Sequence, residues 1–302
     1  MALIKQKPDS TAEWQSKLVL LATMPFAAAG LVLQTHWWAT QMAPVAMVTW
    51  GLSLLLGAVV LKLRAATPAG AACGVALTAS LMFSTVAFPY QPWRTALIPV
   101  LAVSLLAWLA TRVGREQKER LGTAERRQGR TASQVAANLG VAAIASSEFA
   151  QSWLTNALWF TRNTHAPMPL LAIGLAALAE AAADTVSSEV GQVIGGRPRM
   201  ITTLRAVDPG TDGAISPAGT LAGIAAGAAV SLAGALALGG GWEMFWIASA
   251  GGVFGLFFDS LLGATLERRG WLNNDAVNFL STASAAGFAL GLMAAMPHPG
   301  VG

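Results

Sequence analysis

Carboxylates interrupt a stretch of the chain that is otherwise apolar. Asp184 and Glu189 lie in the C-terminal half of an apolar run that begins near Pro167, and Glu180 lies one helical turn before Asp184. A charged side chain near the centre of a bilayer costs about 2.5–3.5 kcal/mol on insertion scales. We therefore expect the protein to use these groups, and oxygen ligands of this kind suit hard cations.

Helical spacing places some of these acidic side chains on one face of a helix and one of them on a different face. Glu180, Asp184 and Ser188 follow each other at i, i+4 and i+8, so a helix places them on one face, whereas Glu189 points elsewhere. Gly191 permits a neighbouring segment to approach closely. An alternative is that the carboxyls are protonated or ion-paired and hold helices together. We favour a functional role, because several unpaired acids in one segment are a costly way to make helix contacts.

A second polar group lies in residues 129–138. Arg130, Gln134 and Asn138 are also spaced i, i+4 and i+8, which predicts that they line one helical face. In this arrangement they would bind phosphate or nucleotide. The alternative is an arginine that extends to the membrane surface, with two amides that bond a neighbouring helix.

The loop over residues 201–216 is a candidate phosphate cradle. Its glycines permit positive φ, so that successive backbone N–H groups can bind an anion. Ser216 and Pro217 are a typical N-cap and first helical residue, which places a helix N-terminus beside the loop. The loop does not match GxxxxGK[ST], and an ordinary turn with a helix cap is the alternative. The candidate residues are Thr202, Thr203, Arg205, Gly210, Thr211, Gly213 and Ser216.

A fourth polar group lies near the C-terminal end of the chain. Asp259 is within an apolar run, and Glu267 follows on the same helical face. Asn274, Asp275 and Asn278 begin the last apolar segment. Asn274 or Asp275 could serve only as a helix N-cap, whereas a carboxylate inside an apolar run has a weaker structural explanation.

The composition is that of an integral membrane protein. Of the 302 residues, 54% are hydrophobic and 11% are charged, and the mean hydropathy is +0.55, whereas soluble domains are about 25% charged. The net charge of +4 does not indicate a nucleic-acid partner, because the basic residues are concentrated in short loops between apolar runs. The abundant Gly and Ala residues suit helices that pack closely.

Apolar runs of about 20 residues predict an all-α, polytopic integral membrane bundle with about nine transmembrane helices. The fifth run is long and contains Glu148, so we expect it to be kinked or broken. The sequence lacks the alternating pattern of a β-barrel. The predicted helices cover 17–35, 42–62, 68–88, 93–112, 132–160, 167–192, 216–238, 242–265 and 275–296.

Lys and Arg residues predict the orientation of these helices. They gather in the N-terminal segment and in alternate connections, which the positive-inside rule makes cytoplasmic. The N-terminus is then cytoplasmic. The histidines, His36, His165 and His298, fall on the outer side, which disfavours a zinc site or a Ser-His-Asp site. The basic residues of these cytoplasmic segments are Lys5, Lys7, Lys17, Lys62, Arg64, Arg112, Arg115, Lys118, Arg120, Arg126, Arg127, Arg130, Arg197, Arg199, Arg205, Arg268 and Arg269, whereas Arg94 and Arg162 lie in the opposite connections.

The chain divides loosely into three predicted parts. Residues 1–112 form a four-helix transmembrane scaffold with almost no ionisable residue inside its apolar runs. Residues 113–130 form a charged cytoplasmic linker, and residues 131–302 form a five-helix catalytic or binding domain in the membrane. The polar groups recur near the cytoplasmic ends of the helices in this last part.

Brought together at one depth, these groups indicate metal-assisted phosphoryl or nucleotidyl transfer. Asp184, Glu189, Asp259 and Asp275 would be the catalytic carboxylates and would hold Mg²⁺, which usually binds one or two carboxylates plus substrate phosphates. Arg130 and the glycine-containing loop would bind the phosphates. A site inside the mouth of a membrane bundle implies a substrate that arrives from the bilayer.

Several motifs together resemble one known family. They are Ala183-Asp-Thr-Val-Ser-Ser-Glu-Val-Gly191, Pro209-Gly-Thr-Asp-Gly-Ala-Ile-Ser216, Gly219-Thr-Leu-Ala-Gly223, Phe258-Asp-Ser-Leu-Leu-Gly-Ala-Thr-Leu266 and Asn274-Asp-Ala-Val-Asn278. Over about residues 129–280 the chain resembles the integral membrane family known as domain of unknown function 92, which includes plant chloroplast phytyl-phosphate kinases. At Asp212 the chain departs from the family, whose members often have Asn there.

The resemblance implies a prenyl (isoprenoid) monophosphate kinase that is Mg²⁺-dependent. The orientation predicted from Lys and Arg gives a protein of the inner (plasma) membrane of the cell, with its active site facing the cytoplasm. CTP or ATP would be the phosphoryl donor, and phytyl or geranylgeranyl phosphate would be the acceptor. Asp184 and Glu189 would carry metal, and the 209–216 loop would hold nucleotide phosphates. Asp259, Asn274, Asp275 and Asn278 would complete the site, with Glu180 and Ser188 along the lipid groove.

Two other functions stay open at this point, as does self-association into a homo-oligomer. An ion- or proton-coupled transporter could use Glu148, Glu180, Asp184 and Asp259 as an ion path. A nucleotidyltransferase that forms a CDP-lipid would use the same residues as the kinase and release pyrophosphate.

Overall fold

The structure is a computed structural model in which residues 12–123, 129–157, 168–194 and 196–296 are described. Parts of the predicted linker and of the fifth and sixth predicted helices therefore lie outside the described residues. So do the following residues named above: Lys5, Lys7, Arg126, Arg127, Arg162, His165, Pro167 and His298.

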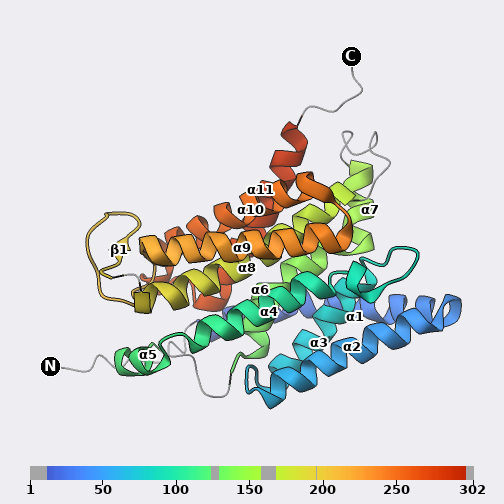
Figure 1. The fold of residues 1–302 in the computed structure, drawn as a ribbon, viewed down its shortest axis with the longest axis horizontal. Coiled ribbons are helices and arrows are strands. Elements are labelled where there is room, and N and C mark those ends of the chain that lie inside the picture. Colours follow the sequence, from blue (N-terminus) through green and yellow to red (C-terminus); the bar gives the residue numbers. More distant parts are fainter. Residues whose placement is uncertain (1–11, 124–128, 158–167, 195, 297–302) are drawn as a thin grey trace.

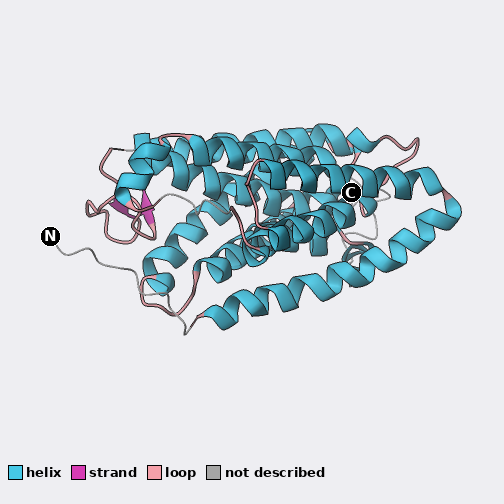
Figure 2. Cartoon of the chain, turned by 90° about the horizontal axis from the view of Figure 1, so that it is seen from below, coloured by secondary structure: helices cyan, strands magenta, loops and turns pink. Residues whose placement is uncertain are grey.

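The all-α class is confirmed, with one two-stranded ladder as the exception in the described part of the chain (Figures 1 and 2). Strands β1 (Arg199–Met200) and β2 (Ala214–Ile215) pair antiparallel. The helices are α1 (Glu13–Gln41), α2 (Ala43–Lys62), α3 (Pro68–Phe83), α4 (Leu97–Arg112), α5 (Arg115–Leu121), α6 (Ala132–Ser146), α7 (Glu148–Ala157), α8 (Met168–Ile194), α9 (Pro217–Leu238), α10 (Gly241–Leu262) and α11 (Asn274–Ala295). A 3-10 turn, η1 (Pro92–Arg94), precedes α4, and a π-helical turn, η3 (Gly263–Glu267), continues α10.

Each of the nine predicted runs contains a helix, but nine membrane crossings stay a prediction. Six helices in the described residues are long and apolar enough to cross a membrane, and α4 with α5 makes a seventh if this pair, bent by 66°, counts as one span. Helices α3 and α6 are apolar but shorter. The predicted break near Glu148 is confirmed, because Ser147 adopts an extended conformation between α6 and α7.

Helix α8 lies at the centre of the bundle and packs against α4, α6, α9, α10 and α11 (Figure 1). Small residues make this packing close. A Cβ atom on Gly223 of α9 would lie 2.6 Å from the carbonyl oxygen of Ala183, and one on Gly219 would lie 2.7 Å from that of Ser187. The expectation that Gly and Ala mediate helix packing is therefore confirmed for α8 and α9.

The N-terminal helices are continuous with the rest of the bundle. Helices α1 and α3 pack against α6, and α4 packs against α8 and α9. One hydrophobic core includes Leu77 of α3, Val100 of α4, Leu139 of α6 and Leu178 of α8. The predicted linker is also partly structured, because it contains α5, whose Lys118 is almost fully buried.

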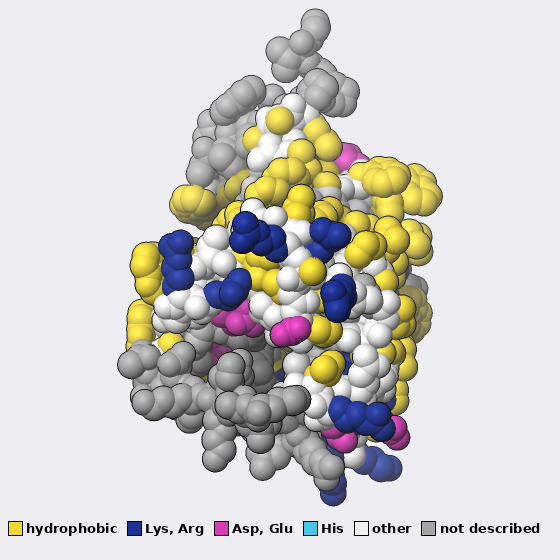
Figure 3. Space-filling view, turned by 90° about the vertical axis from the view of Figure 1, so that its left-hand side faces the viewer, with side chains coloured by type: hydrophobic (Ala, Val, Ile, Leu, Met, Phe, Trp, Pro, Cys, Tyr) yellow, Lys and Arg dark blue, Asp and Glu magenta, His cyan; other side chains and the backbone are white. Residues whose placement is uncertain are grey.

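Lys and Arg side chains gather at the end of the molecule that carries α5 and β1, with acidic side chains among them (Figure 3). Clustering of basic residues at one end is what the positive-inside rule predicts for a cytoplasmic face. The orientation of the N-terminus in the membrane stays a prediction.

Candidate functional site

A polar cavity of about 200 Å³ lies where four helices end on the basic side of the bundle. The C-terminal part of α8, the N-terminus of α9, the C-terminal end of α10 and the N-terminus of α11 form its walls, together with the loop over 209–216. The sequence predictions that line it are Asp184, Ser188, Gly210, Thr211, Gly213, Ser216, Asp259, Asn274 and Asn278. Half of the predicted site therefore converges in one place.

Acidic oxygens from two helices meet in this cavity. Asp184 of α8 and Asp259 of α10 interact electrostatically, and Glu267 adds a third carboxyl from the π-helical turn η3. The Ser188 hydroxyl donates to Asp184 Oδ1 at 3.4 Å. One oxygen of Asp259, Oδ2, is buried and has no hydrogen-bond partner among the described residues. A buried, unsatisfied carboxylate oxygen is costly, and a cation would satisfy it.

The donor set fits magnesium better than a metal that needs a complete protein cage. Among the described residues, no three Asp, Glu, His or Cys side chains converge tightly enough to hold a metal ion. Mg²⁺ is commonly held by one or two carboxylates plus waters and substrate phosphates. Asp184 and the unsatisfied oxygen of Asp259 meet that requirement.

The loop over 209–216 has the glycine conformations that the sequence predicted, and its role as a phosphate cradle stays a prediction. Gly210 and Gly213 adopt positive φ values of 84° and 73°. A Cβ atom at Gly213 would collide with the backbone of Ala264, so the loop packs tightly against η3. The Ser216 hydroxyl accepts a hydrogen bond from the Gly219 amide at 3.2 Å, and Pro217 begins α9. The helix N-terminus thus borders the acidic pair, which suits an anion with a bound cation.

Asp212 lies in the same loop and lines the cavity. Displacement of water by neighbouring protein atoms raises the pKa of its carboxyl, and the positive charge of Arg268 opposes this shift. In the sequence, Asp212 is distinguished by its departure from the family pattern. Its position in the cavity gives that departure a direct electrostatic consequence for a bound anion.

Two predicted metal ligands are not among the residues that line the cavity. Glu189 accepts a hydrogen bond from the buried ammonium of Lys118, which also donates to the carbonyl oxygen of Ala110. Asp275 is buried and accepts a hydrogen bond from the Ser16 hydroxyl of α1 at 2.6 Å. Neither side chain lines the cavity in the structure. The structure therefore does not bring either acid into the cavity, because each is paired with a residue distant in sequence, and their role as metal ligands stays a prediction.

Glu180 is also placed differently from the prediction. It is only 1% exposed, and a Cβ atom on Gly255 would contact its side chain, so it is enclosed between α8 and α10 rather than open to a groove. Ser188 belongs to the polar cavity beside Asp184 and not to an apolar groove.

The predicted face of Arg130, Gln134 and Asn138 is not formed as expected. Arg130 precedes the N-cap Thr131, so it lies outside α6, and the Gln134 side chain accepts from the Thr131 amide at 2.8 Å in a capping box. Gln134 is therefore occupied as a helix cap. Asn138 does reach the site region, because Asn278 donates to its Oδ1 at 3.3 Å.

The Thr202–Arg205 part of the predicted cradle lies outside the cavity. Thr202, Thr203 and Arg205 are exposed in the turn that follows β1. The structure adds Ser187, Gln192 and Ser260 to the cavity lining, besides Asp212 and Glu267. Glu267 could have been found from its helical register with Asp259. The others had no signal beyond sequence proximity to predicted site residues.

The helical bundle with its acidic cavity and adjoining glycine loop defines an integral membrane protein with a polar site at one end. Residues 51–286 match the model of the integral membrane protein family DUF92. The chain belongs to this family, as the motifs around Asp184 and Asp259 had indicated.

Several relatives are similar to the chain over part of its length. An uncharacterised membrane protein of Methanocaldococcus jannaschii is 44% identical over 36% of this chain and 45% of its own length. One from the cyanobacterium Synechocystis is 33% identical over 67% of this chain and 75% of its own length. The chloroplastic protein VTE6 of Arabidopsis thaliana is 28% identical over 60% of this chain and 54% of its own length. No solved structure matches the chain.

Proposed function

We propose that this protein is a membrane-embedded prenyl-phosphate kinase, which transfers the γ-phosphoryl group of CTP or ATP to an isoprenoid monophosphate. The observation that carries the proposal is the meeting of Asp184 and Asp259 with the 209–216 loop and the N-terminus of α9 in one cavity. Phosphoryl transfer needs this combination of cation ligands and anion-binding backbone. The likeness to the chloroplastic protein VTE6, together with the resemblance to phytyl-phosphate kinases, supports a prenyl phosphate as the acceptor.

Each part of the cavity has a role in this reaction. Asp184 and Asp259 would hold a magnesium ion, whose chemistry is to neutralise charge on phosphate oxygens. The amides of the loop around Gly210 and Gly213 bind nucleotide phosphates, and Ser216 holds the start of α9 in place. No general base is needed, because the attacking monophosphate is already an anion. Catalysis then consists of positioning and charge compensation.

The site is proposed to face the cytoplasm of a cell whose inner (plasma) membrane holds the protein. The polar cavity lies at the basic end of the molecule, where Lys and Arg gather (Figure 3). Cytoplasmic nucleotides would enter from this end, whereas a lipid substrate would enter from the bilayer.

Purified full-length protein is the material for the test. It is incubated with geranylgeranyl phosphate, Mg²⁺ and either CTP or ATP, and lipid products are separated. We expect prenyl diphosphate and a nucleoside diphosphate, and Asp184→Asn serves as the inactive control. Absence of diphosphate with both nucleotides and with phytyl phosphate as well, while a known kinase works in the same detergent, would contradict the proposal.

The same assay distinguishes the alternatives. A nucleotidyltransferase would release pyrophosphate and form a CDP-lipid instead. A transporter would form no diphosphate, and a separate measurement in proteoliposomes would show substrate-dependent flux that Asp184→Asn reduces, because Asp184 would be part of its ion path. Glu148, which the transporter hypothesis uses, is exposed at the start of α7 and does not line the polar cavity. The kinase proposal therefore uses the clustered residues most directly.

A further inference from the structure

A second, larger cavity lies between the N-terminal helices and α6. Its volume is about 490 Å³, within the usual range for sites that bind small molecules. Leu56 and Val60 of α2 line one side, Val100 and Val103 of α4 line another, and Leu139 of α6 contributes to the wall. Helix α2 packs against α1 and α3, whereas α4 packs against α8 and α9, so the cavity lies between two layers of the bundle.

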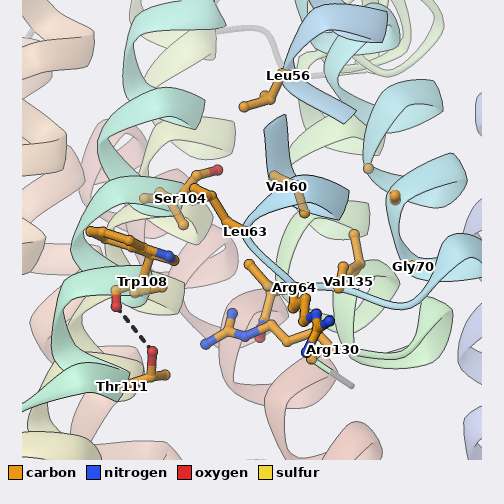
Figure 4. A pocket seen from close by; sticks show the side chains of 18 of the residues that line it. Leu56, Val60, Leu63, Arg64, Gly70, Ser104, Trp108, Thr111, Arg130 and Val135 are labelled. Atoms are coloured by element: carbon orange, nitrogen blue, oxygen red, sulfur yellow. Dashed lines mark hydrogen bonds between the residues drawn. The ribbon is translucent and has the colours of Figure 1, made fainter. Parts of the chain in front are cut away.

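One end of this cavity is positively charged. Figure 4 shows Arg64 and Arg130 at the end opposite Leu56. The apolar side chains Val60 and Leu63 lie between Leu56 and the two arginines. Arg112 also lines the cavity, and its guanidinium lies over the Trp108 ring, 4.0 Å from the centroid. Arginine is the residue best suited to bind phosphate through paired N–H donors.

The backbone fixes the two arginines beside each other. The Arg130 amide donates to the carbonyl oxygen of Ala65 at 3.0 Å, and the Thr67 amide donates to the carbonyl oxygen of Arg130 at 3.0 Å. A Cβ atom on Gly129, whose φ is 74°, would collide with the backbone of Ala65. Two segments more than sixty residues apart are thereby held together at the charged end.

The charged end adjoins the polar cavity. The Arg130 guanidinium donates to the Thr185 hydroxyl at 3.2 Å, and Thr185 follows Asp184 in α8. Asn138 lines the large cavity and accepts from Asn278, which lines the polar cavity. A phosphate bound by the arginines would therefore be a neighbour of a nucleotide bound at the 209–216 loop.

We propose that the large cavity holds the isoprenoid chain of the lipid monophosphate and that Arg64 and Arg130 bind its phosphate. This inference rests on the proposed kinase function and adds the location of the acceptor. An oxygen of the lipid phosphate attacks the γ-phosphorus of the nucleotide, and the bond from that phosphorus to the β–γ bridging oxygen breaks. The products are the lipid diphosphate and a nucleoside diphosphate, which leaves with the bonding electron pair.

A binding measurement tests the location without turnover. Full-length protein in nanodiscs is titrated with radiolabelled geranylgeranyl phosphate in the absence of nucleotide. Ser104 of α4 lines the cavity, so Ser104→Phe should fill it and weaken binding at least about tenfold. Leu105→Phe is the matched control, because Leu105 is exposed and outside the cavity lining, and it should bind as the wild type does.

The charged end is tested in the same assay. Arg64→Gln should weaken binding about tenfold or more, because a charge-assisted hydrogen bond is lost, and Arg64→Lys should restore part of it. Lys62→Gln is the control, since Lys62 is basic and near in sequence but does not line the cavity. Arg64 is exposed, so its replacement should leave the fold intact. Excess inorganic phosphate should displace little of the lipid, since it lacks the chain that the apolar walls bind.

The outcomes separate this inference from the kinase proposal. The proposed acceptor site would be overturned if Ser104→Phe and Arg64→Gln both bind geranylgeranyl phosphate as tightly as the wild type does. It would also be overturned if the wild type does not bind this lipid. Loss of binding in both variants with no diphosphate formed by the wild type would leave the site standing and overturn the kinase. Displacement by inorganic phosphate as effective as by the lipid would overturn the assignment of a lipid acceptor.

Discussion

The two cavities differ in what lines them and in which part of the chain supplies the walls. The polar cavity is built from α8 to α11, with oxygen ligands and backbone amides, and measures about 200 Å³. The large cavity measures about 490 Å³ and is built from α2, α3, α4, α5 and α6, with many apolar lining residues, arginines at one end and one acidic residue, Glu119. Arg130 and Asn138 connect the two. The division suggests that nucleotide and lipid are bound by different halves of one bundle.

Replacement of Asp184 or Asp259 should have the largest effect, because it should impair catalysis and leave lipid binding at the large cavity intact. Asp184→Asn or Asp259→Asn removes a proposed cation ligand, and we expect kcat to fall at least about 100-fold. Binding of geranylgeranyl phosphate at the large cavity should stay within about twofold of the wild type, because these residues do not line it. Kinetic assays and the titration described above measure the two quantities. If lipid binding in these variants falls as much as kcat does, the two cavities do not bind their ligands separately.

Neither member of the Lys118–Glu189 pair lines the polar or the large cavity, so the pair should affect stability more than catalysis. Glu189→Gln leaves a buried ammonium without its partner, which costs about 3–5 kcal/mol of unfolding free energy. Thermal unfolding in detergent should show a lower Tm. The double replacement Lys118→Met with Glu189→Leu should recover most of this loss. If Glu189→Gln instead keeps its Tm and loses Mg²⁺ dependence, Glu189 is a metal ligand as the sequence predicted.

Two glycines with similar φ provide the smallest and most specific test. Gly213 has a φ of 73° and borders Ala264, whereas Gly270 has a φ of 72° with open space around it. Both alanine variants carry backbone strain of about 1 kcal/mol, but only Gly213→Ala must also displace the loop from η3. We expect Gly213→Ala to raise the nucleotide KM several-fold and Gly270→Ala to leave it unchanged. Steady-state kinetics with varied nucleotide measure both KM values. An equal change of KM in the two variants would contradict a phosphate cradle at this loop.

Sequence patterns were sufficient to predict the class of protein and many of the residues that line the polar cavity. Hydropathy identified the helices, because a long apolar segment in a membrane must form its backbone hydrogen bonds internally, and a helix does so. Local chemistry identified the Ser216 cap, the positive φ of Gly210 and Gly213, and the break before Glu148. Asp184 and Asp259 were found because each is an acid in an apolar segment.

Which polar residues meet in one cavity depends on how the helices pack. Glu189 and Asp275 resemble Asp184 in the sequence, yet Lys118 and Ser16 from distant helices bind them. The large cavity was not predicted, because most of its walls come from helices that were expected to be a scaffold. Arg130 had been predicted to bind phosphate, but Arg64 lies at a helix end like other basic residues and had no such signal. Side-chain pairing across a bundle depends on helix rotation and register, and the periodicity of one helix does not contain this information.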